Sequence, residues 1–150
     1  MTSASLVLRK LTTLLDHASR VERRRPDALD AFRSDLDRQD ALAMSLLVAL
    51  QEAADICLHI AADEGWGIAS SYAEGFALVA RHDVIPMALA DRLSAIAALR
   101  NRVAHGYGSV DFERLWREAP DGVEALRAFA AAVGRFLGRE VLPDADPHAD

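Results

Sequence analysis

Four polar residues in the last third of the chain have the side-chain types needed for chemistry on a phosphate. The segment LRNRVAHGYGSVD, residues 99–111, contains Arg100, Asn101, His105 and Tyr107 within eight residues. A guanidinium binds phosphate through charge-assisted hydrogen bonds in a planar arrangement. An imidazole exchanges a proton near neutral pH and can therefore act as a general acid or base. Together these residues indicate a site for an anionic substrate whose reaction moves a proton.

The position of Arg100 in the helical pattern is unusual. The apolar residues before it, Leu89, Leu93 and Ile96, recur at spacings of four and three, and the next step falls on Arg100. This spacing places all four residues on one face of a helix, the face that packs against a core. A buried guanidinium without a partner is energetically costly. We therefore expect a carboxylate, a second chain or an anionic ligand beside Arg100.

Two glycines follow the histidine of this segment. On an ideal helix His105 would lie about 140° around from Arg100, because the helical period is ~3.6 residues. Gly106 and Gly108 allow the helix to end near His105, so that His105 and Tyr107 can turn toward Arg100. For each residue alone a structural role is the simpler interpretation: a core ion pair for Arg100, a helix cap for His105 and loop packing for Tyr107. Their combination favours a functional site.

The elements that must position this segment are helices. Apolar residues in the first 21 positions recur at spacings of three and four, and "RVERRRPD" then predicts the end of that helix, since the residue before Pro26 leaves helical geometry. Arg23, Arg24 and Arg25 are predicted to form a solvated helix end, with RNA contact as the second interpretation. A short helix is expected after Asp27. The apolar positions of the helix in the first 21 residues are Ala4, Val7, Leu11, Leu14, Ala18 and Val21.

Residues 37–64 predict the longest helix, which the glycines of EGWG would close. Ser71 and Glu74 have the spacing of a capping box at the start of the next helix. In that helix Tyr72 and Phe76 are interpreted as core residues rather than as a platform on which bases stack. Pro86 suits the first turn of the helix that carries Arg100.

Two helices are predicted beyond the glycines. Asp111 would cap a short helix containing Leu115 and Trp116. Pro120 would then break the chain, and Asp121 with Glu124 has the capping-box spacing that would open a final helix. Because no useful alternation of period two occurs, we predict an all-α antiparallel bundle of four main helices with short accessory helices. Residues 1–142 would form one domain and residues 143–150 an acidic, disordered tail.

Composition limits the classes of function. The 17 basic and 23 acidic residues give a formal net charge of −6, which argues against nonspecific coating of nucleic acid but permits a local phosphate site. The single cysteine, Cys57, is expected in the core. The other histidines, His17, His59, His82 and His148, are scattered, so no metal site or cofactor is expected. The N-terminus has no signal-peptide or membrane-span pattern, and a soluble cytoplasmic protein is expected.

The segment RNRVAHGY resembles the Arg-x4-His motif of the HEPN superfamily. In the extended form Arg-x4-His-x-Tyr it resembles the HepT toxins, bacterial and archaeal proteins encoded beside a minimal nucleotidyltransferase antitoxin, MntA. The stretches DRQDA, SYAEGFALV and GSVDFERLW are also similar to the family pattern in order and spacing. The resemblance covers about residues 37–137.

The resemblance implies a HEPN-like bundle and a metal-independent endoribonuclease toxin. It assigns Arg100 and His105 to the catalytic pair, Asn101 to a supporting position, and Tyr107 to the tyrosine on which the antitoxin places AMP. It also implies a homodimer in which two motifs meet at one cleft, with RNA as substrate and an MntA-like nucleotidyltransferase as partner.

A noncatalytic binding module is the alternative. The same Arg–His pocket could hold a nucleotide, or dock a transferase as one part of a two-part nucleotidyltransferase. The acidic net charge favours this alternative, whereas the presence of both Arg100 and His105 favours the nuclease. A plain helical oligomerisation protein would explain the apolar stripes but would leave Arg100 without a purpose.

Overall fold

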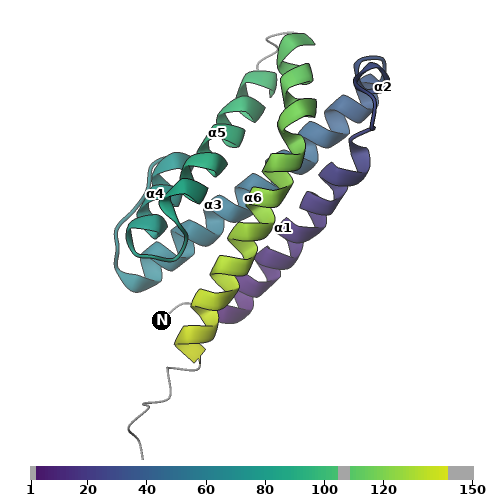
Figure 1. The fold of residues 1–150 in the computed structure, drawn as a ribbon. Helices are drawn as coiled ribbons and strands as arrows, with labels where there is room; N and C mark the ends of the chain where they lie inside the picture. The colour runs from purple at the N-terminus through teal and green to yellow at the C-terminus, as the bar shows by residue number, and fades with distance from the viewer. Residues whose placement is uncertain (1–2, 105–108, 142–150) are drawn as a thin grey trace, which may run out of the picture.

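The computed structural model describes residues 3–104 and 109–141, and every regular element in these two ranges is an α-helix (Figure 1). The predicted all-α bundle is therefore confirmed. Four helices are long and two are short. His105, Tyr107 and the predicted tail 143–150 lie outside the described residues. The helices are α1 (Ala4–Arg24), α2 (Leu29–Arg33), α3 (Leu36–Glu64), α4 (Tyr72–Arg81), α5 (Met87–Ala104) and α6 (Ser109–Val141).

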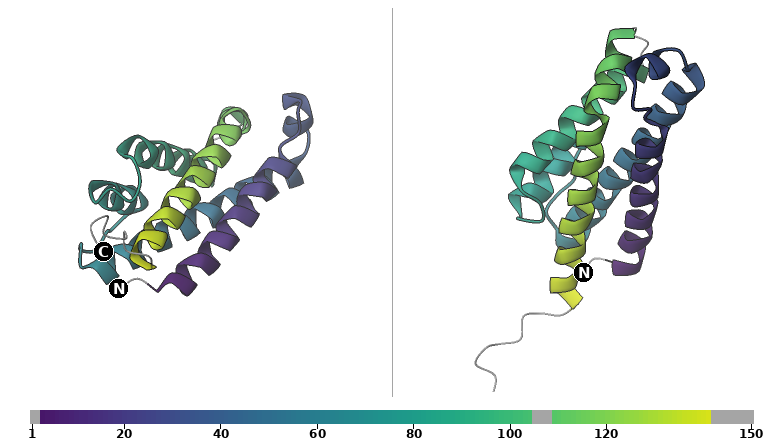
Figure 2. Two further views of the ribbon diagram at one scale, coloured as in Figure 1. Left: turned by 60° about the horizontal axis from the view of Figure 1, so that its bottom comes forward. Right: turned by 45° about the vertical axis from the view of Figure 1, so that its right-hand side comes forward.

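The four long helices run antiparallel in chain order. α3 packs along α1 and also contacts α2, α4, α5 and α6, so that it is the central helix of the bundle. The end of α5 and the start of α6 lie at the same end of the bundle as α2, whereas the start of α1 and the end of α6 lie at the opposite end (Figures 1 and 2). We call the first of these the motif end, because it contains Arg100 and Asn101.

The buried face of α1 follows the predicted periodicity. The buried residues of α1 are Val7, Leu11, Leu14, Ala18 and Val21, all members of the predicted stripe. α3 is apolar on most sides because it is surrounded by other helices. Among the described helices it alone has the length and composition of a membrane span, and half of that window is buried. The central helix of a bundle has the same composition, so this is weak evidence for a membrane.

The predicted caps at the end of α3 and the start of α4 are confirmed. Gly65 ends α3 in the left-handed region with a φ of 72°. The Ser71 hydroxyl caps α4 by accepting a hydrogen bond from the Glu74 main-chain N–H at 3.1 Å. The Glu74 carboxylate accepts from the N–H and hydroxyl of Ser70, at 2.7 and 2.6 Å, rather than from Ser71 as an ideal capping box would have it. These hydrogen bonds lower the pKa of Glu74.

The predicted break at Pro120 was wrong, because α6 continues through it as one helix of 33 residues. A proline inside a helix leaves the carbonyl four residues earlier without its N–H donor, and here that carbonyl belongs to Trp116. The Arg25 Nε atom donates to this oxygen at 2.6 Å. Asp111 and Asp121 therefore lie within one helix instead of starting two.

The Arg25 guanidinium also covers the Trp116 ring, 4.0 Å from its centroid, and the indole N–H donates to the Pro26 carbonyl at 2.8 Å. The prediction of a solvated end to α1 was consequently wrong for two of its three arginines. Arg24 is half-buried and donates to the Ser45 hydroxyl, while Arg23 is exposed. Contacts between distant segments, rather than the helix dipole, hold Arg24 and Arg25.

Replacing Arg25 by methionine should lower the free energy of unfolding by about 1–3 kcal/mol. The change leaves the Trp116 carbonyl without a donor and removes the cation from the indole ring. Urea unfolding measures the effect. Arg23→Met is the matched control, and we expect it to change stability by less than about 0.5 kcal/mol because Arg23 is exposed. Equal effects for the two substitutions would contradict the role assigned to Arg25.

Candidate functional site

Arg100 lies near the end of α5, on the side of that helix that meets the core. Its neighbours Leu93, Ile96 and Leu99 are buried, with exposed fractions of 0%, 5% and 0%. Arg100 itself is half-buried, and its Nε atom is buried without a hydrogen-bond partner in residues 3–104 and 109–141. The predicted core-type position of Arg100 is therefore confirmed.

Among the described residues, burial and one nearby phenol shape the electrostatics of Arg100. Burial lowers the pKa of Arg100, and the nearby Tyr72 phenol partly offsets this effect. No carboxylate from the described part of the chain forms an ion pair with it. Of the three partners that the sequence allowed, a carboxylate is thus not found in residues 3–104 and 109–141.

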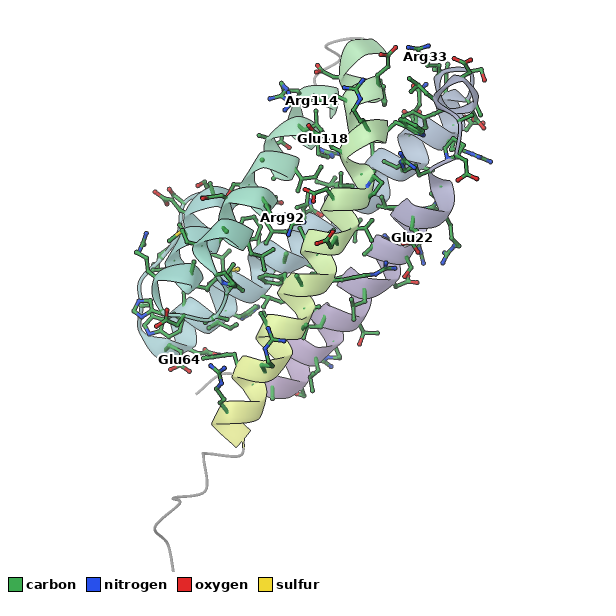
Figure 3. All side chains as sticks on the ribbon, in the orientation of Figure 1. Glu22, Arg33, Glu64, Arg92, Arg114 and Glu118 are labelled. Carbon is green, nitrogen blue, oxygen red and sulfur yellow. The ribbon has the colours of Figure 1, made fainter. Side chains whose placement is uncertain are left out.

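Several other arginines have carboxylate partners, as Arg100 does not in the described residues. Arg33 and Arg114 lie at the motif end, the latter beside Glu118 (Figure 3). The partner of Arg33 is Glu113 at 2.7 Å, and that of Arg114 is Glu118 at 3.1 Å. Lower on α5, Arg92 donates to Asp121 at 2.6 Å. Arg24 and Arg25 are also half-buried, but they donate to a hydroxyl and a carbonyl oxygen, whereas the buried Nε atom of Arg100 has no acceptor among the described residues and can receive an anion.

Asn101 follows Arg100 on α5 and is exposed beside a groove of about 420 Å³ between α4 and α5. Tyr72, at the start of α4, also contributes to this groove. Sequence reasoning placed Tyr72 in the core together with Phe76. Phe76 is fully buried as predicted, but Tyr72 is only half-buried. The residues that line this α4–α5 groove are Ser71, Tyr72, Ala73, Ser94, Ala97, Ala98 and Asn101.

An ion pair connects the two helices on either side of residues 105–108. The Arg102 Nε atom lies 3.9 Å from the Asp111 Oδ1 atom, and the Asp111 side chain is 18% exposed. Asp111 is in the first turn of α6, where the helix dipole favours a negative charge. In the sequence, this ion pair is visible only as two opposite charges on either side of the glycines, and the predicted helix cap at Asp111 does not include Arg102.

A second hollow, of about 340 Å³, lies between α1 and α6 beside Pro120. Its two arginines are already engaged: Arg25 bonds to the Trp116 carbonyl, and Arg127 donates to Glu22 at 2.9 Å. This hollow therefore lacks a free cation for a phosphate. No group of three His, Cys, Asp or Glu side chains with the closeness of a metal site occurs in the parts of the chain that the structure describes.

The motif residues thus fall into two groups. Arg100 and Asn101 are neighbours at the motif end, whereas His105 and Tyr107 lie outside the described residues, so their predicted approach to Arg100 stays a prediction. Since α5 ends at Ala104 and α6 begins at Ser109, only four residues join the two helices at this end.

Comparisons with known proteins identify a family by sequence and similar solved structures by fold. The family model described as Ribonuclease HepT-like matches residues 14–133. A protein of Shewanella oneidensis named mRNA nuclease HepT is 26% identical over 108 residues, which cover 72% of this chain and 80% of that protein.

Two solved structures are similar along nearly their whole length. One is a tri-AMPylated HEPN toxin of Shewanella oneidensis in complex with MNT antitoxin, with a TM-score of 0.81 at 22% identity, covering 89% of this chain and 99% of that one. The other is a toxin-antitoxin structure with AMP-PNP, with a TM-score of 0.80 at 22% identity, covering 87% and 99%. At this identity the similarity shows a shared fold.

Proposed function

Because the chain belongs to the Ribonuclease HepT-like family, we propose that it is the ribonuclease toxin of a toxin–antitoxin pair. It acts in the cytoplasm as a homodimer, whose two Arg-x4-His motifs meet at one cleft and cleave RNA without a metal ion. The observation that carries this proposal is Arg100, a half-buried guanidinium without an anionic partner in the described residues. In this proposal, the anion that binds to Arg100 is a phosphate of the RNA.

The chemistry uses the ribose 2′-hydroxyl as nucleophile. His105 removes the hydroxyl proton while the 2′-oxygen forms a bond to phosphorus, and the bond from phosphorus to the 5′-oxygen breaks. The leaving 5′-oxygen takes up a proton from solvent water, so the products are a 2′,3′-cyclic phosphate and a 5′-hydroxyl. Arg100 stabilises the negative charge that develops on the phosphate oxygens. Asn101 orients the phosphate or the imidazole.

The first test is cleavage of total cellular RNA by the purified protein in EDTA, followed by analysis of the product ends. We expect discrete fragments with cyclic phosphate ends, and no cleavage of DNA, because DNA lacks the 2′-hydroxyl. Cleavage that EDTA abolishes would contradict the metal-independent mechanism. If protein shown to be unmodified at Tyr107 cleaves no RNA, the noncatalytic binding module replaces the nuclease.

We also propose that an MntA-like nucleotidyltransferase silences the protein by attaching AMP to Tyr107. Tyr107 is two residues from His105 in sequence, so AMP would bring bulk and a phosphate charge close to the catalytic pair. The AMPylated HEPN toxin with a similar fold supports this regulation.

Incubation with the MntA-like nucleotidyltransferase and ATP should therefore add AMP to Tyr107 and stop RNA cleavage. Mass spectrometry of the tryptic peptide locates the group, and the cleavage assay follows the activity. The Tyr107→Phe protein should stay unmodified and remain active under the same conditions. An unmodified Tyr107 in the wild-type protein, or loss of activity in both proteins, would contradict the proposed regulation.

A further inference from the structure

The α4–α5 groove has the size and the position of a subsite beside the phosphate. Its volume of about 420 Å³ falls in the range of ~300–1,000 Å³ that small-molecule sites occupy. Asn101, which lines it, directly follows Arg100 in the same helix. Tyr72, which also lines it, is close enough to Arg100 to influence its electrostatics. A ligand in this groove would therefore lie next to whatever anion Arg100 binds.

The walls of the groove are mainly apolar and include one aromatic ring. Tyr72 is half-buried and packs against the core, yet contributes to the lining of the groove. The remaining apolar lining consists of alanines, among them the exposed Ala73 and Ala98, which leave the space open. Proteins that bind single-stranded RNA stack its flat bases on such aromatic rings.

Polar groups at the rim have unused hydrogen-bonding capacity. Asn101 is exposed and makes no hydrogen bond to another described residue, so both its amide N–H and its carbonyl oxygen are available. The Ser71 hydroxyl accepts from the Glu74 N–H at 3.1 Å, which leaves its own proton free to donate. The Ser94 hydroxyl donates to the Ala90 carbonyl at 2.9 Å, which leaves its oxygen free to accept.

We infer that the α4–α5 groove binds one nucleobase of the RNA, adjacent to the phosphate held by Arg100, with the base on Tyr72 and its polar edge facing Asn101. This inference rests on the proposed ribonuclease function and adds a site that determines which nucleotide flanks the cut. Tyr72 contacts the base of the substrate and not its reacting atoms, so it determines specificity rather than catalysis.

The first experiment removes the ring and the base in turn. The substrate is a short single-stranded RNA with a mapped cleavage site, and its comparison versions lack the base on one or the other side of the cut. For the wild-type protein, loss of one of these bases should raise KM about tenfold, because stacking of one base typically contributes about 5- to 150-fold to affinity.

The Tyr72→Leu protein should show the same rise in KM with the intact RNA and no further rise with the RNA that lacks this base. Tyr72→Phe keeps the ring and should stay within about threefold of wild type. An equal effect of base removal in the wild-type and Tyr72→Leu proteins would overturn the inference while leaving the proposed ribonuclease function intact. A wild-type protein that cleaves no RNA overturns both.

The second experiment fills the groove without changing Tyr72. Ala98 is exposed and lines the groove, whereas Ala95 is exposed on the same helix and does not line it. Ala98→Phe should raise KM for the intact RNA about tenfold, and Ala95→Phe should leave KM within about twofold of wild type. Thermal unfolding of both variants should match wild type, because neither alanine is buried.

Light scattering on the same samples shows whether the groove binds a nucleobase or a second copy of the chain. If the groove binds RNA, Ala98→Phe retains the oligomeric state of the wild-type protein. If Ala98→Phe dissociates the protein into smaller species and Ala95→Phe does not, the groove is an interface between copies and the nucleobase assignment is wrong. Equal KM values for both variants and wild type would also overturn it.

Discussion

Replacing Arg100 by methionine should reduce RNA cleavage by about 10²–10³-fold and leave the protein at least as stable as the wild type. The loss of activity is the usual effect of removing a group that stabilises charge in a transition state. The stability is retained because Arg100 has a buried, unpartnered Nε atom and no ion pair among the described residues. Methionine fills similar space without a desolvated donor. The position would thus exchange stability for function.

The measurement is kcat/KM on one RNA together with urea unfolding of the same protein. Arg92→Met is the matched control, since Arg92 lies on the same helix and is paired with Asp121 at 2.6 Å. We expect this control to cleave RNA at the wild-type rate and to lose about 0.2–1 kcal/mol of stability, as is typical of partly exposed ion pairs. A destabilisation of several kcal/mol by Arg100→Met would falsify the absence of an internal partner.

Replacing His105 by alanine should reduce cleavage by about 10²–10⁴-fold, the usual contribution of a general acid or base. Because Arg100 remains, the variant should still bind RNA. The measurements are cleavage in EDTA and the affinity for an RNA whose 2′-hydroxyl at the cut is replaced by hydrogen. A fall in both cleavage and affinity would point to a role of His105 in binding alone.

His82→Ala is the control for this second prediction. His82 is exposed at the end of α4 and stacks on Trp66, with ring centroids 4.0 Å apart. It should therefore be dispensable for cleavage. If the His82 and His105 variants cleave RNA equally fast, His105 is not the general base and the noncatalytic module becomes the better interpretation.

The helices themselves were predictable because their signals are local. The stripe of α1, the glycine at the end of α3 and the serine cap of α4 each depend on residues within a few positions of one another. Cys57 is buried in the core as expected, and this burial raises the pKa of its thiol. The half-buried position of Arg100 was also predictable, since it follows from the spacing of three and four in the apolar residues that precede it.

The errors arose where a residue meets a distant segment. Pro120 has the local signature of a break, yet α6 continues because Arg25, 91 residues from Trp116, supplies the missing hydrogen bond. Arg24 is turned from solvent by Ser45 on α3. In each case the energy of the local conformation is altered by a donor or acceptor whose position depends on how the helices pack.

The sequence by itself therefore determined the class of fold and the helix that carries Arg100 and Asn101, while the chemistry of Arg100, Asn101, His105 and Tyr107 stays a prediction from the sequence. Only the tertiary structure decided that Arg100 has no carboxylate beside it in the described residues, and that Tyr72 borders a groove next to Asn101. The physical reason is that periodicity fixes which face of a helix a side chain occupies. The charges and cavities that meet this face are fixed by the other helices packed against it.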